Sequence, residues 1–427
     1  MTGMSVTTAA TSAIVIGAGV IGTASALQLA RAGVMVTLID PDAPGSGCSS
    51  GNAGSISEES IAPMALPGML AKVPGWLIDP EGPLYVRWRY LPRAAPWLLR
   101  WVLASRQETV EASAAALRPF LKGAVDDYAD LLGPQNYATL VQRRGQLLVW
   151  ESARQSRSER AGHALRERHG VAMRWLTPGE IGEIEPELSS IFRRGLLLER
   201  HGHMADPQRV VAILAEEFRG RGGRVVQGRA KEVVATEGGA RVVLDNGEAH
   251  DADRMVIAAG AWSAELARQL GIHVPLETER GYHAMIDGAS TLCSRPVMHG
   301  DRSFIASPIG GGLRVAGTVE IAGLTAPPDY RRAHTLLTQA RYMFPNLEAG
   351  KVGYWMGCRP SLPDSVPVIG AAPDSPAILF AFGHGHLGMT GAPATARIVR
   401  DLALGRRPNI DLAPFRIDRF WPFQKSR

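Results

Sequence analysis

The sequence predicts an α/β domain into which a second, α+β domain is inserted. Strands and helices alternate in pattern at both ends of the chain, whereas the middle is more mixed. The length of 427 residues is too great for one compact core and suits two domains. With 45% hydrophobic and 20% charged residues, the composition is that of an ordinary globular protein, which excludes wholesale disorder and fibrous repeats.

The chain begins with a strand–helix–strand pattern. The apolar run at 12–17 ends in glycines, and apolar residues at helical spacing continue to Gly33. A second apolar run, at 34–39, ends at Asp40, and residues 41–60 have a loop composition. The later patterns predict helices over 84–132, 156–169, 207–219 and 392–404 and within 328–343, and strands over 145–150, 224–227, 240–244, 255–258, 377–382 and parts of 281–315.

Charge and cysteine content narrow the class of protein. The net charge is only +5, and the basic residues are nearly all arginine without a reading motif, so a nucleic-acid partner is disfavoured. The three cysteines, Cys48, Cys293 and Cys358, are odd in number, far apart and without metal spacing. We therefore expect no disulfide framework, a reducing compartment and no metal site.

The chain shows neither a secretory leader nor an apolar stretch long enough to span a bilayer, so we expect a cytoplasmic protein. The stretch 87–106 is rich in Arg and Trp and has two interpretations. In one, it lies on an acidic membrane surface, peripheral to the inner face of the membrane. In the other, the tryptophans are buried under the second domain while the arginines stay solvated.

A glycine motif follows the first strand. Gly17, Gly19 and Gly22, with Val20 and Ile21 between them, fit GxGxxG: a tight turn, a close approach of backbone to a pyrophosphate, and close helix–strand packing. Asp40 ends the second strand, where a carboxylate can accept ribose hydroxyls and disfavours a 2′-phosphate. The motif leaves FAD, NAD and a glycine-rich turn of an unrelated unit open.

Two later glycine clusters favour a flavin over NAD. Gly260 follows the buried strand at 255–258, where backbone would approach a ligand closely. A second cluster separates the last strand from the last helix and comprises Gly385, His386, Leu387, Gly388, Met389 and Thr390. A helix that starts near Thr390 would direct N–H groups at an anionic group such as N1 and O2 of a reduced flavin.

Taken together, these motifs resemble the D-amino-acid oxidase superfamily of FAD-dependent oxidoreductases, which includes glycine and sarcosine oxidases. The resemblance rests on GAGVIG, SSGNAGSIS, AAGAWS, GCRPSLPDSVPVIG and FGHGHLGMTGAPAT. The RPSLPDSVPVIG, GHGHLG and RVAGTVEIAG segments are most similar to the bacterial D-amino-acid dehydrogenase branch.

The resemblance implies a Rossmann-like FAD-binding domain (10–85, 203–275 and 355–427) with an inserted substrate-binding domain of antiparallel sheet and helices (86–202 and 276–354). It further implies that Arg359 grips the substrate carboxylate by a planar, bidentate contact and that Tyr282 bonds the carboxylate or shapes the pocket. The FAD contacts that it adds to the glycines and Asp40 are Ser49, Ser50, Asn52, Ala53, Gly54 and the backbone around Lys231.

The implied reaction is hydride transfer from Cα of a D-amino or cyclic imino acid, D-proline and hydroxy-D-proline included, to flavin N5, which leaves an imine. The implied electron acceptor is a quinone or the respiratory chain. Gly357 stands where some sarcosine oxidases attach flavin through cysteine, so we expect non-covalent FAD. His386 replaces an arginine of glycine oxidases. A glycine- or sarcosine-type oxidase and a non-catalytic FAD-binding subunit remain alternatives, and the sequence leaves the substrate side chain, the acceptor and the oligomeric state open.

Overall fold

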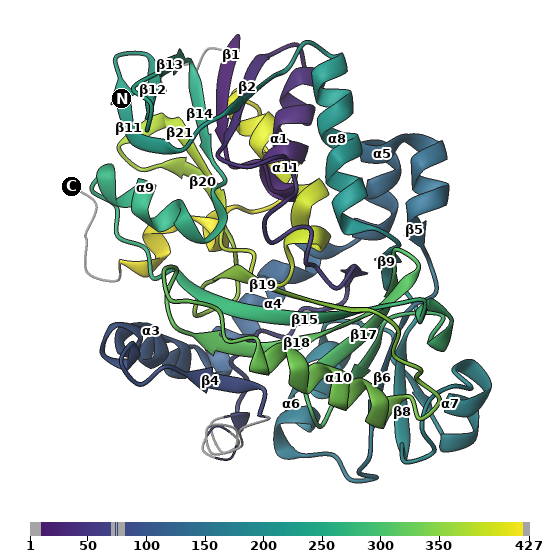
Figure 1. Ribbon diagram of the computed structural model, residues 1–427. Helices are drawn as coiled ribbons and strands as arrows, with labels where there is room; N and C mark the ends of the chain where they lie inside the picture. Colours follow the sequence, from purple (N-terminus) through teal and green to yellow (C-terminus); the bar gives the residue numbers. More distant parts are fainter. Residues whose placement is uncertain (1–9, 70–72, 74, 76–81, 422–427) are drawn as a thin grey trace.

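The computed structural model describes residues 10–69, 73, 75 and 82–421. A six-stranded sheet in the order β10-β2-β1-β14-β21-β20 is parallel except for β20 (Figure 1). Its strands are β1 (Ser12–Ile16), β2 (Met35–Asp40), β10 (Arg224–Gln227), β14 (Arg254–Ile257), β20 (Val368–Ala372) and β21 (Ser375–Phe382). Both faces of β1 are buried, Val15 toward one core and Ile14 and Ile16 toward another, which explains its continuous apolar run.

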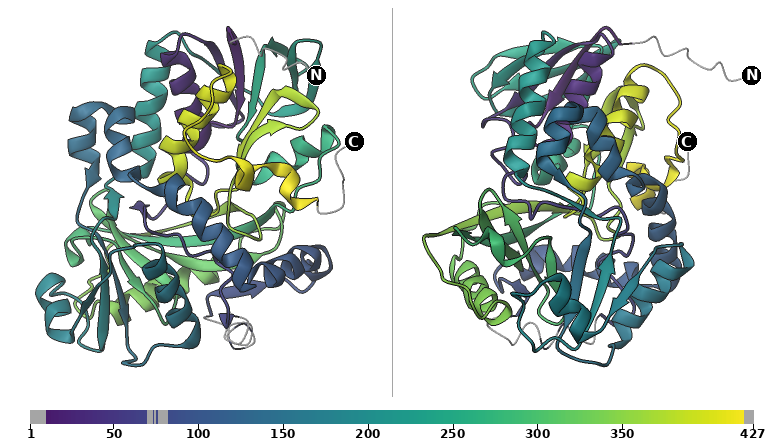
Figure 2. Two further views of the ribbon diagram at one scale, coloured as in Figure 1. Left: turned by 180° about the vertical axis from the view of Figure 1, so that it is seen from behind. Right: turned by 90° about the vertical axis from the view of Figure 1, so that its right-hand side faces the viewer.

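Helices cover one face of this sheet, and a small antiparallel sheet covers the other (Figures 1 and 2). The helices are α1 (Val20–Arg31), α5 (Ala124–Leu140), α8 (Pro207–Gly220) and α11 (Gly388–Ala403). The opposite layer consists of β11 (Ala230–Thr236), β12 (Gly239–Leu244) and β13 (Ala249–Ala252), with η2 (Gly260–Trp262) and α9 (Ser263–Gln269) beside it and η4 (Ala413–Phe415) and η5 (Ile417–Phe420) near the end of the chain.

A nine-stranded, mostly antiparallel sheet forms the second layer and runs β19-β15-β18-β17-β16-β6-β8-β7, with β4 beside β18. The strands are β4 (Leu84–Val86), β6 (Gln146–Trp150), β7 (Arg174–Leu176), β8 (Arg194–Leu198), β15 (Glu277–Asp287), β16 (Val297–His299), β17 (Phe304–Ile309), β18 (Gly312–Ile321) and β19 (Val352–Ser361). One face packs against α7 (Pro178–Ile184) and α10 (Arg331–Met343). The shorter elements are α6 (Arg157–Arg168), η3 (Ser290–Leu292) and a small sheet of β3 (Ser55–Ile56), β9 (Gly202–Met204) and β5 (Val141–Gln142).

The stretch 84–132, predicted as helical, is broken. After β4 come α3 (Leu91–Ala104), α4 (Gln107–Leu121) and α5. Arg106 is extended, with ψ 140°, and Gly123 takes φ +79°, so each interrupts the helical hydrogen bonding. The apolar spacing predicted the helices, but it did not show these two breaks. The loop composition at 41–60 likewise hid the short strand β3.

The parallel sheet with its antiparallel partner confirms the predicted fold class. The predicted division into segments remains a proposal, and β19 crosses its boundary at 355. We propose the same division with two changes: the last segment begins after Ser361, and α5, which packs on the parallel sheet, belongs to the FAD-binding domain. None of the described helices combines the length and apolar composition needed to cross a bilayer. The start of the chain, on which the expected lack of a leader depends, lies mostly outside the described residues.

Candidate cofactor and substrate site

The turn between β1 and α1 has no room for side chains. Gly17 takes φ +106°, and a Cβ on it would lie 2.3 Å from the carbonyl oxygen of Ala258. A Cβ on Gly22 would lie 1.8 Å from the carbonyl oxygen of Gly17. At Gly19 the nearest atom to such a Cβ is Oγ of Ser49, at 3.4 Å. Two of the glycines are therefore required by packing, and the third leaves its side of the turn open to a ligand.

Asp40 lies beside this turn at the end of β2. Its carboxylate accepts hydrogen bonds from the N–H groups of Ala18, at 2.6 Å, and Asp42, at 2.9 Å. Burial raises the pKa of the Asp40 carboxyl, and the two N–H groups oppose that rise. In the first turn of α1, Val20 N–H donates to Ser49 Oγ at 2.9 Å. No described side chain caps the next two positions, Ile21 and Gly22. They offer N–H groups to an anion such as a pyrophosphate.

The loop between β2 and β3 is fixed to the nine-stranded sheet by its backbone. Arg314 of β18 donates through one terminal nitrogen to the carbonyls of Ser50, at 2.7 Å, and Asn52, at 2.6 Å. His283 Nδ1 of β15 lies 3.3 Å from the carbonyl oxygen of Gly51. This loop holds the predicted residues Ser49, Ser50, Asn52, Ala53 and Gly54.

The side chain of Asn52 serves the turn itself, because its Oδ1 accepts the Gly54 N–H at 2.7 Å. At the head of the loop, the Cys48 thiol donates to the carbonyl oxygen of Cys358 at 2.9 Å, and burial raises the pKa of Cys48 to about 12. The loop therefore has mainly backbone groups and small side chains to offer a ligand. The thiol of Cys48 is protonated near pH 7.

The start of α11 brings a second helix N-terminus to the same region. The helix begins at Gly388, two residues before the predicted Thr390, and no described side chain caps its N-cap position, Leu387. Tyr128 OH donates to the carbonyl oxygen of Met389 at 2.6 Å, and Thr390 Oγ1 accepts the Ser57 N–H at 3.0 Å. These bonds fix the segment that holds the predicted residues Gly385, His386, Leu387, Gly388, Met389 and Thr390.

A pair of glycines clears one face of the nine-stranded sheet. Gly281 of β15 pairs with Gly357 of β19. Two residues away on each strand, and on the same face, Glu279 pairs with Arg359. A Cβ on Gly281 would lie 2.1 Å from Cζ of Arg359, and a Cβ on Gly357 would lie 2.0 Å from the ring of Trp355. The guanidinium and the indole therefore lie flat on the sheet over the glycine pair.

The electrostatics of this face leave Arg359 as its available cation. The one hydrogen bond that Arg359 donates among the described residues goes to the carbonyl oxygen of Thr318, at 3.3 Å. Burial lowers the pKa of Arg359, and Glu279 opposes the fall. Burial raises the pKa of Glu279, which is 5% exposed. One of its carboxylate oxygens has no hydrogen-bond partner among the residues that the structure describes.

Two histidines beside Arg359 are neutral near pH 7. His283 stacks on Trp355 with ring centroids 5.0 Å apart, and burial lowers its pKa to about 3. Burial also lowers the pKa of His386 to about 4, and the charge of Arg359 adds to the effect. His386 nevertheless presents exposed surface. His386 is therefore exposed but lies close enough to Arg359 for that charge to act on its imidazole.

Tyr282 does not join Arg359. Successive residues of a strand point to opposite faces, so Tyr282 lies on the face opposite Gly281 and Arg359. It is 1% exposed in the core beneath α10, and its hydroxyl donates to Glu320 at 2.5 Å and accepts the Asp329 N–H at 3.0 Å. This placement gives Tyr282 a supporting position behind the sheet, and we do not retain it as a substrate contact.

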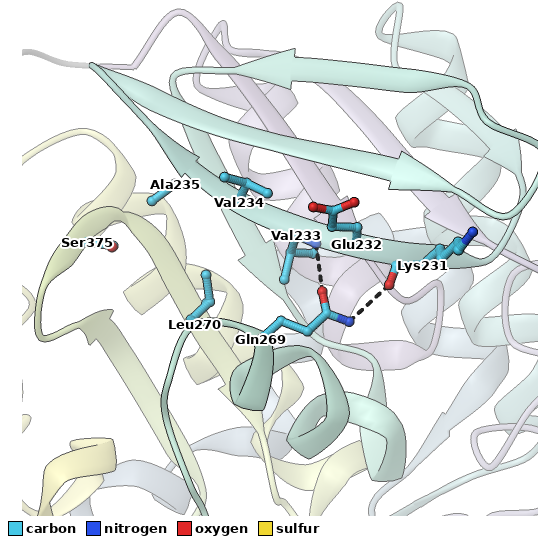
Figure 3. Close-up of a pocket in the computed structure, with 8 residues that line it drawn as sticks. All are labelled: Lys231, Glu232, Val233, Val234, Ala235, Gln269, Leu270 and Ser375. Carbon is cyan, nitrogen blue, oxygen red and sulfur yellow. Dashed lines mark hydrogen bonds between the residues drawn. The ribbon is translucent and has the colours of Figure 1, made fainter.

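Of the two predicted cofactor contacts Gly260 and Lys231, the first follows a strand of the parallel sheet and the second lies on the outer three-stranded sheet. Gly260 follows β14 with φ +55°, and a Cβ on it would have no atom within 4 Å, so its backbone is open to a ligand. Lys231 lines an outer pocket of about 570 Å³ between β11 and α9 (Figure 3). Its carbonyl oxygen accepts from the Gln269 side chain at 2.9 Å. Closer to Asp40 is Gly228, whose N–H donates to the Asp40 carbonyl oxygen at 3.0 Å.

One group of possible metal ligands occurs among the described residues, and it lies elsewhere. Glu151, His299 and Asp301 approach within 4.8 Å of one another, and Arg302 already pairs with Glu151 at 3.1 Å. His299 is fully buried against Phe192, which places it in the core.

Sequence reasoning missed Trp355, Glu279 and Arg314. The register of β15 against β18 and β19 places them at the site, and no local pattern encodes that register. Two glycines could have pointed to the cleared face: Gly281, next to the predicted Tyr282, and Gly357, two residues before Arg359.

The chain is similar to known FAD-dependent oxidoreductases over most of its length. Residues 12–402 match the family model described as FAD dependent oxidoreductase (DAO). The chain is 41% identical to a D-amino-acid oxidase of Bradyrhizobium diazoefficiens, covering 95% of this chain and 98% of that protein. It is 32% identical to a D-amino acid dehydrogenase of Dechloromonas aromatica, covering 92% and 97%. A glycine oxidase structure from Geobacillus kaustophilus shares the fold, with a TM-score of 0.71, 22% identity and coverage of 96% and 98%. The chain therefore belongs to the DAO family of FAD-dependent oxidoreductases.

Proposed function

We propose that this enzyme is a D-amino-acid dehydrogenase that oxidises D-amino or cyclic imino acids, D-proline and hydroxy-D-proline among them, to imines. The observation that carries the proposal is the Arg359 guanidinium, which lies over Gly281 and donates a single hydrogen bond to the residues that the structure describes. A planar guanidinium with free N–H groups matches a carboxylate in charge and in shape. The D configuration is supported by the names of the curated relatives.

The residues fit FAD, because the N-termini of α1 and α11, the open backbone at Gly19 and Gly260, and Asp40 all follow the carboxyl ends of strands of the parallel sheet. When bound, FAD would accept a hydride from the substrate Cα at N5, and water would hydrolyse the imine. Arg359 would fix the carboxylate and thereby select which Cα hydrogen faces the cofactor. Because His283 and His386 are neutral, neither adds a positive charge against an amine on this face.

Anaerobic bleaching of the flavin by a panel of D-, L- and N-methyl amino acids tests the proposal. We expect D-amino acids or D-proline to bleach it and the L-enantiomers to leave it yellow. Arg359→Leu should keep FAD but lose about 100-fold or more in kcat/KM, since a charged bidentate contact contributes about 3 kcal/mol. Arg359→Lys keeps the positive charge but loses the bidentate geometry, so its kcat/KM should lie between those of the wild type and Arg359→Leu. Wild-type kinetics for Arg359→Leu would remove Arg359 from the mechanism, and a flavin that no substrate bleaches would favour a non-catalytic subunit.

An oxygen-using amine oxidase is the second candidate, and the relative named D-amino-acid oxidase favours it. Oxygen uptake and the reduction of a quinone or dye, measured with the same substrate, separate the two. Turnover that depends on a quinone or dye supports the dehydrogenase. Oxygen consumption that matches substrate oxidation, at a rate similar to that with a quinone or dye, supports the oxidase. Bleaching of the flavin by glycine or sarcosine alone supports a glycine- or sarcosine-type oxidase.

We also propose that FAD is held non-covalently. Cys358 is next to Arg359 in β19 and therefore points to the opposite face, and the Cys48 thiol is protonated and bonded to a carbonyl. Acid precipitation of the purified yellow protein should release all the flavin to the supernatant. Flavin that stays with the pellet would contradict the proposal.

A further inference from the structure

Helix α3 packs one face against the end of the sheet that carries Arg359. Ala94 and Trp97 are 0% and 6% exposed and form a small core with Ile321. The Trp97 indole N–H donates to the carbonyl oxygen of Ser361 at 3.2 Å. Of the two interpretations of the stretch 87–106, the one with buried tryptophans therefore holds for Trp97.

The opposite face of α3 is apolar and uncovered. Leu99 is 61% exposed, and Leu91 and Leu103 are 46% and 43% exposed. Trp88, in the turn just before the helix, is 72% exposed. We call these four residues the outer face of α3. Single exposed apolar residues are ordinary, but four large ones on and beside one helix mark a contact surface.

The segment that carries the outer face is basic, with Glu81 and Glu108 flanking it in the sequence. Residues 82–107 contain five arginines and no Asp or Glu. Arg87 pairs with the buried Glu320 at 2.6 Å. Within the part of the chain that the structure describes, none of the other four (Arg89, Arg93, Arg100 and Arg106) forms an ion pair. The helix lies at the edge of the molecule in Figure 1 and in the left view of Figure 2.

We propose that the outer face of α3 docks on a bilayer that contains anionic lipids. Its Trp and Leu side chains enter the boundary between headgroups and acyl chains, and its arginines meet the lipid phosphates. A second copy of the chain is the poorer occupant, because a two-fold contact through this face would bring arginines against arginines. The surface is separate from Arg359 and the glycine turn, so this inference does not depend on the proposed function.

Vesicle flotation of the full-length holoenzyme tests the inference. The probes are vesicles of phosphatidylcholine alone and of phosphatidylcholine with phosphatidylglycerol at roughly 7:3. We expect binding to the anionic vesicles that weakens with salt, and at least about 10-fold weaker partition onto phosphatidylcholine alone. The double variants Leu99→Ser/Leu103→Ser and Arg93→Gln/Arg100→Gln should each lower partition about 10-fold.

Matched controls change similar side chains elsewhere. Met35→Ser removes a 72% exposed side chain on β2, and Arg406→Gln/Arg407→Gln removes two exposed arginines beyond α11. Both should bind vesicles like the wild type, and FAD content and Tm verify that every variant is folded. Absence of binding to the anionic vesicles, or equal losses in the controls, overturns the proposal. A dimer in sedimentation that Leu99→Ser/Leu103→Ser converts to monomer, with no vesicle binding, overturns it in favour of a second copy.

Discussion

Gly281 determines where the guanidinium of Arg359 can lie. Arg359 has a long, flexible side chain, and its guanidinium reaches the sheet surface only because Gly281 lacks a Cβ. The facing Gly357 gives the same room to Trp355, so one glycine pair sets the positions of both side chains. The positions of Arg359 and Trp355 therefore depend on the two glycines as much as on the two side chains themselves.

The variant Gly281→Ala should misplace Arg359, because the new methyl group would lie 2.1 Å from Cζ. A displacement on the order of 1 Å can cost about 100-fold in rate, so we expect kcat/KM to fall about that far while FAD binding is retained. Steady-state kinetics with the best substrate of the panel measure the effect.

Gly353→Ala is the matched control. Gly353 lies on the same strand as Arg359, and a Cβ on it would have no atom within 4 Å. It should leave kcat/KM unchanged. Equal activities for the two alanine variants would show that the position of Arg359 does not limit the reaction.

At the scale of the elements, the loop between β2 and β3 couples the two large sheets. It begins at the parallel sheet and is bonded to β15, β18 and β19 through its backbone and the Cys48 thiol. Arg314 supplies two of these bonds from one nitrogen. The loop is thereby held at a fixed place between the cofactor turn and the substrate face.

Arg314→Gln should loosen this loop and weaken FAD binding. A hydrogen bond from a charged group contributes about 1.5–3 kcal/mol, so we expect the Kd for FAD to rise about 10-fold or more. Titration of the apoprotein by fluorescence gives the Kd. Arg241→Gln, which removes an exposed ion pair between β12 and β13, should leave it unchanged. An unchanged Kd for Arg314→Gln would contradict the role of the loop.

At the scale of the whole molecule, burial keeps many histidines neutral. Burial lowers the pKa of seven of the eleven to about 3 or 4: His163, His201, His203, His283, His299, His384 and His386. They lie in both layers, so their protonation acts on the fold as a whole.

The fold should lose stability as the pH falls below about 6.5. Each histidine has a lower pKa folded than unfolded, so the unfolded chain binds more protons between those values. The stability is complete above the unfolded pKa and decreases from about pH 6.5 toward pH 4. If unfolding takes up about two protons near pH 6, the free energy of unfolding falls by about 2.7 kcal/mol per pH unit. Calorimetry of the holoenzyme from pH 8 to 5 measures the Tm, and a flat Tm from pH 7.5 to 5.5 would contradict this account.

Local patterns predicted the elements whose determinants are local. Gly17, Gly22 and Asp40 sit in one strand–helix–strand unit, and the strand at 224–227 and the helix from Pro207 follow from apolar spacing and capping. Local patterns did not predict the breaks in the helix expected over 84–132, and they did not show that Tyr282 lies on the sheet face opposite Arg359. A helix break depends on a few backbone angles, and an alternating strand does not show which of its buried faces holds the ligand.

The sequence by itself determined the family and its FAD cofactor, and it singled out the glycine turn and Arg359 as candidate site residues, because both lie in short local motifs. Only the tertiary structure decided what surrounds Arg359. Trp355, Glu279, Gly281 and Arg314 come from three strands that are far apart in the chain, and hydrogen-bond register brings them to one face. That register is set by the packing of the whole sheet, so no single segment of the sequence contains it.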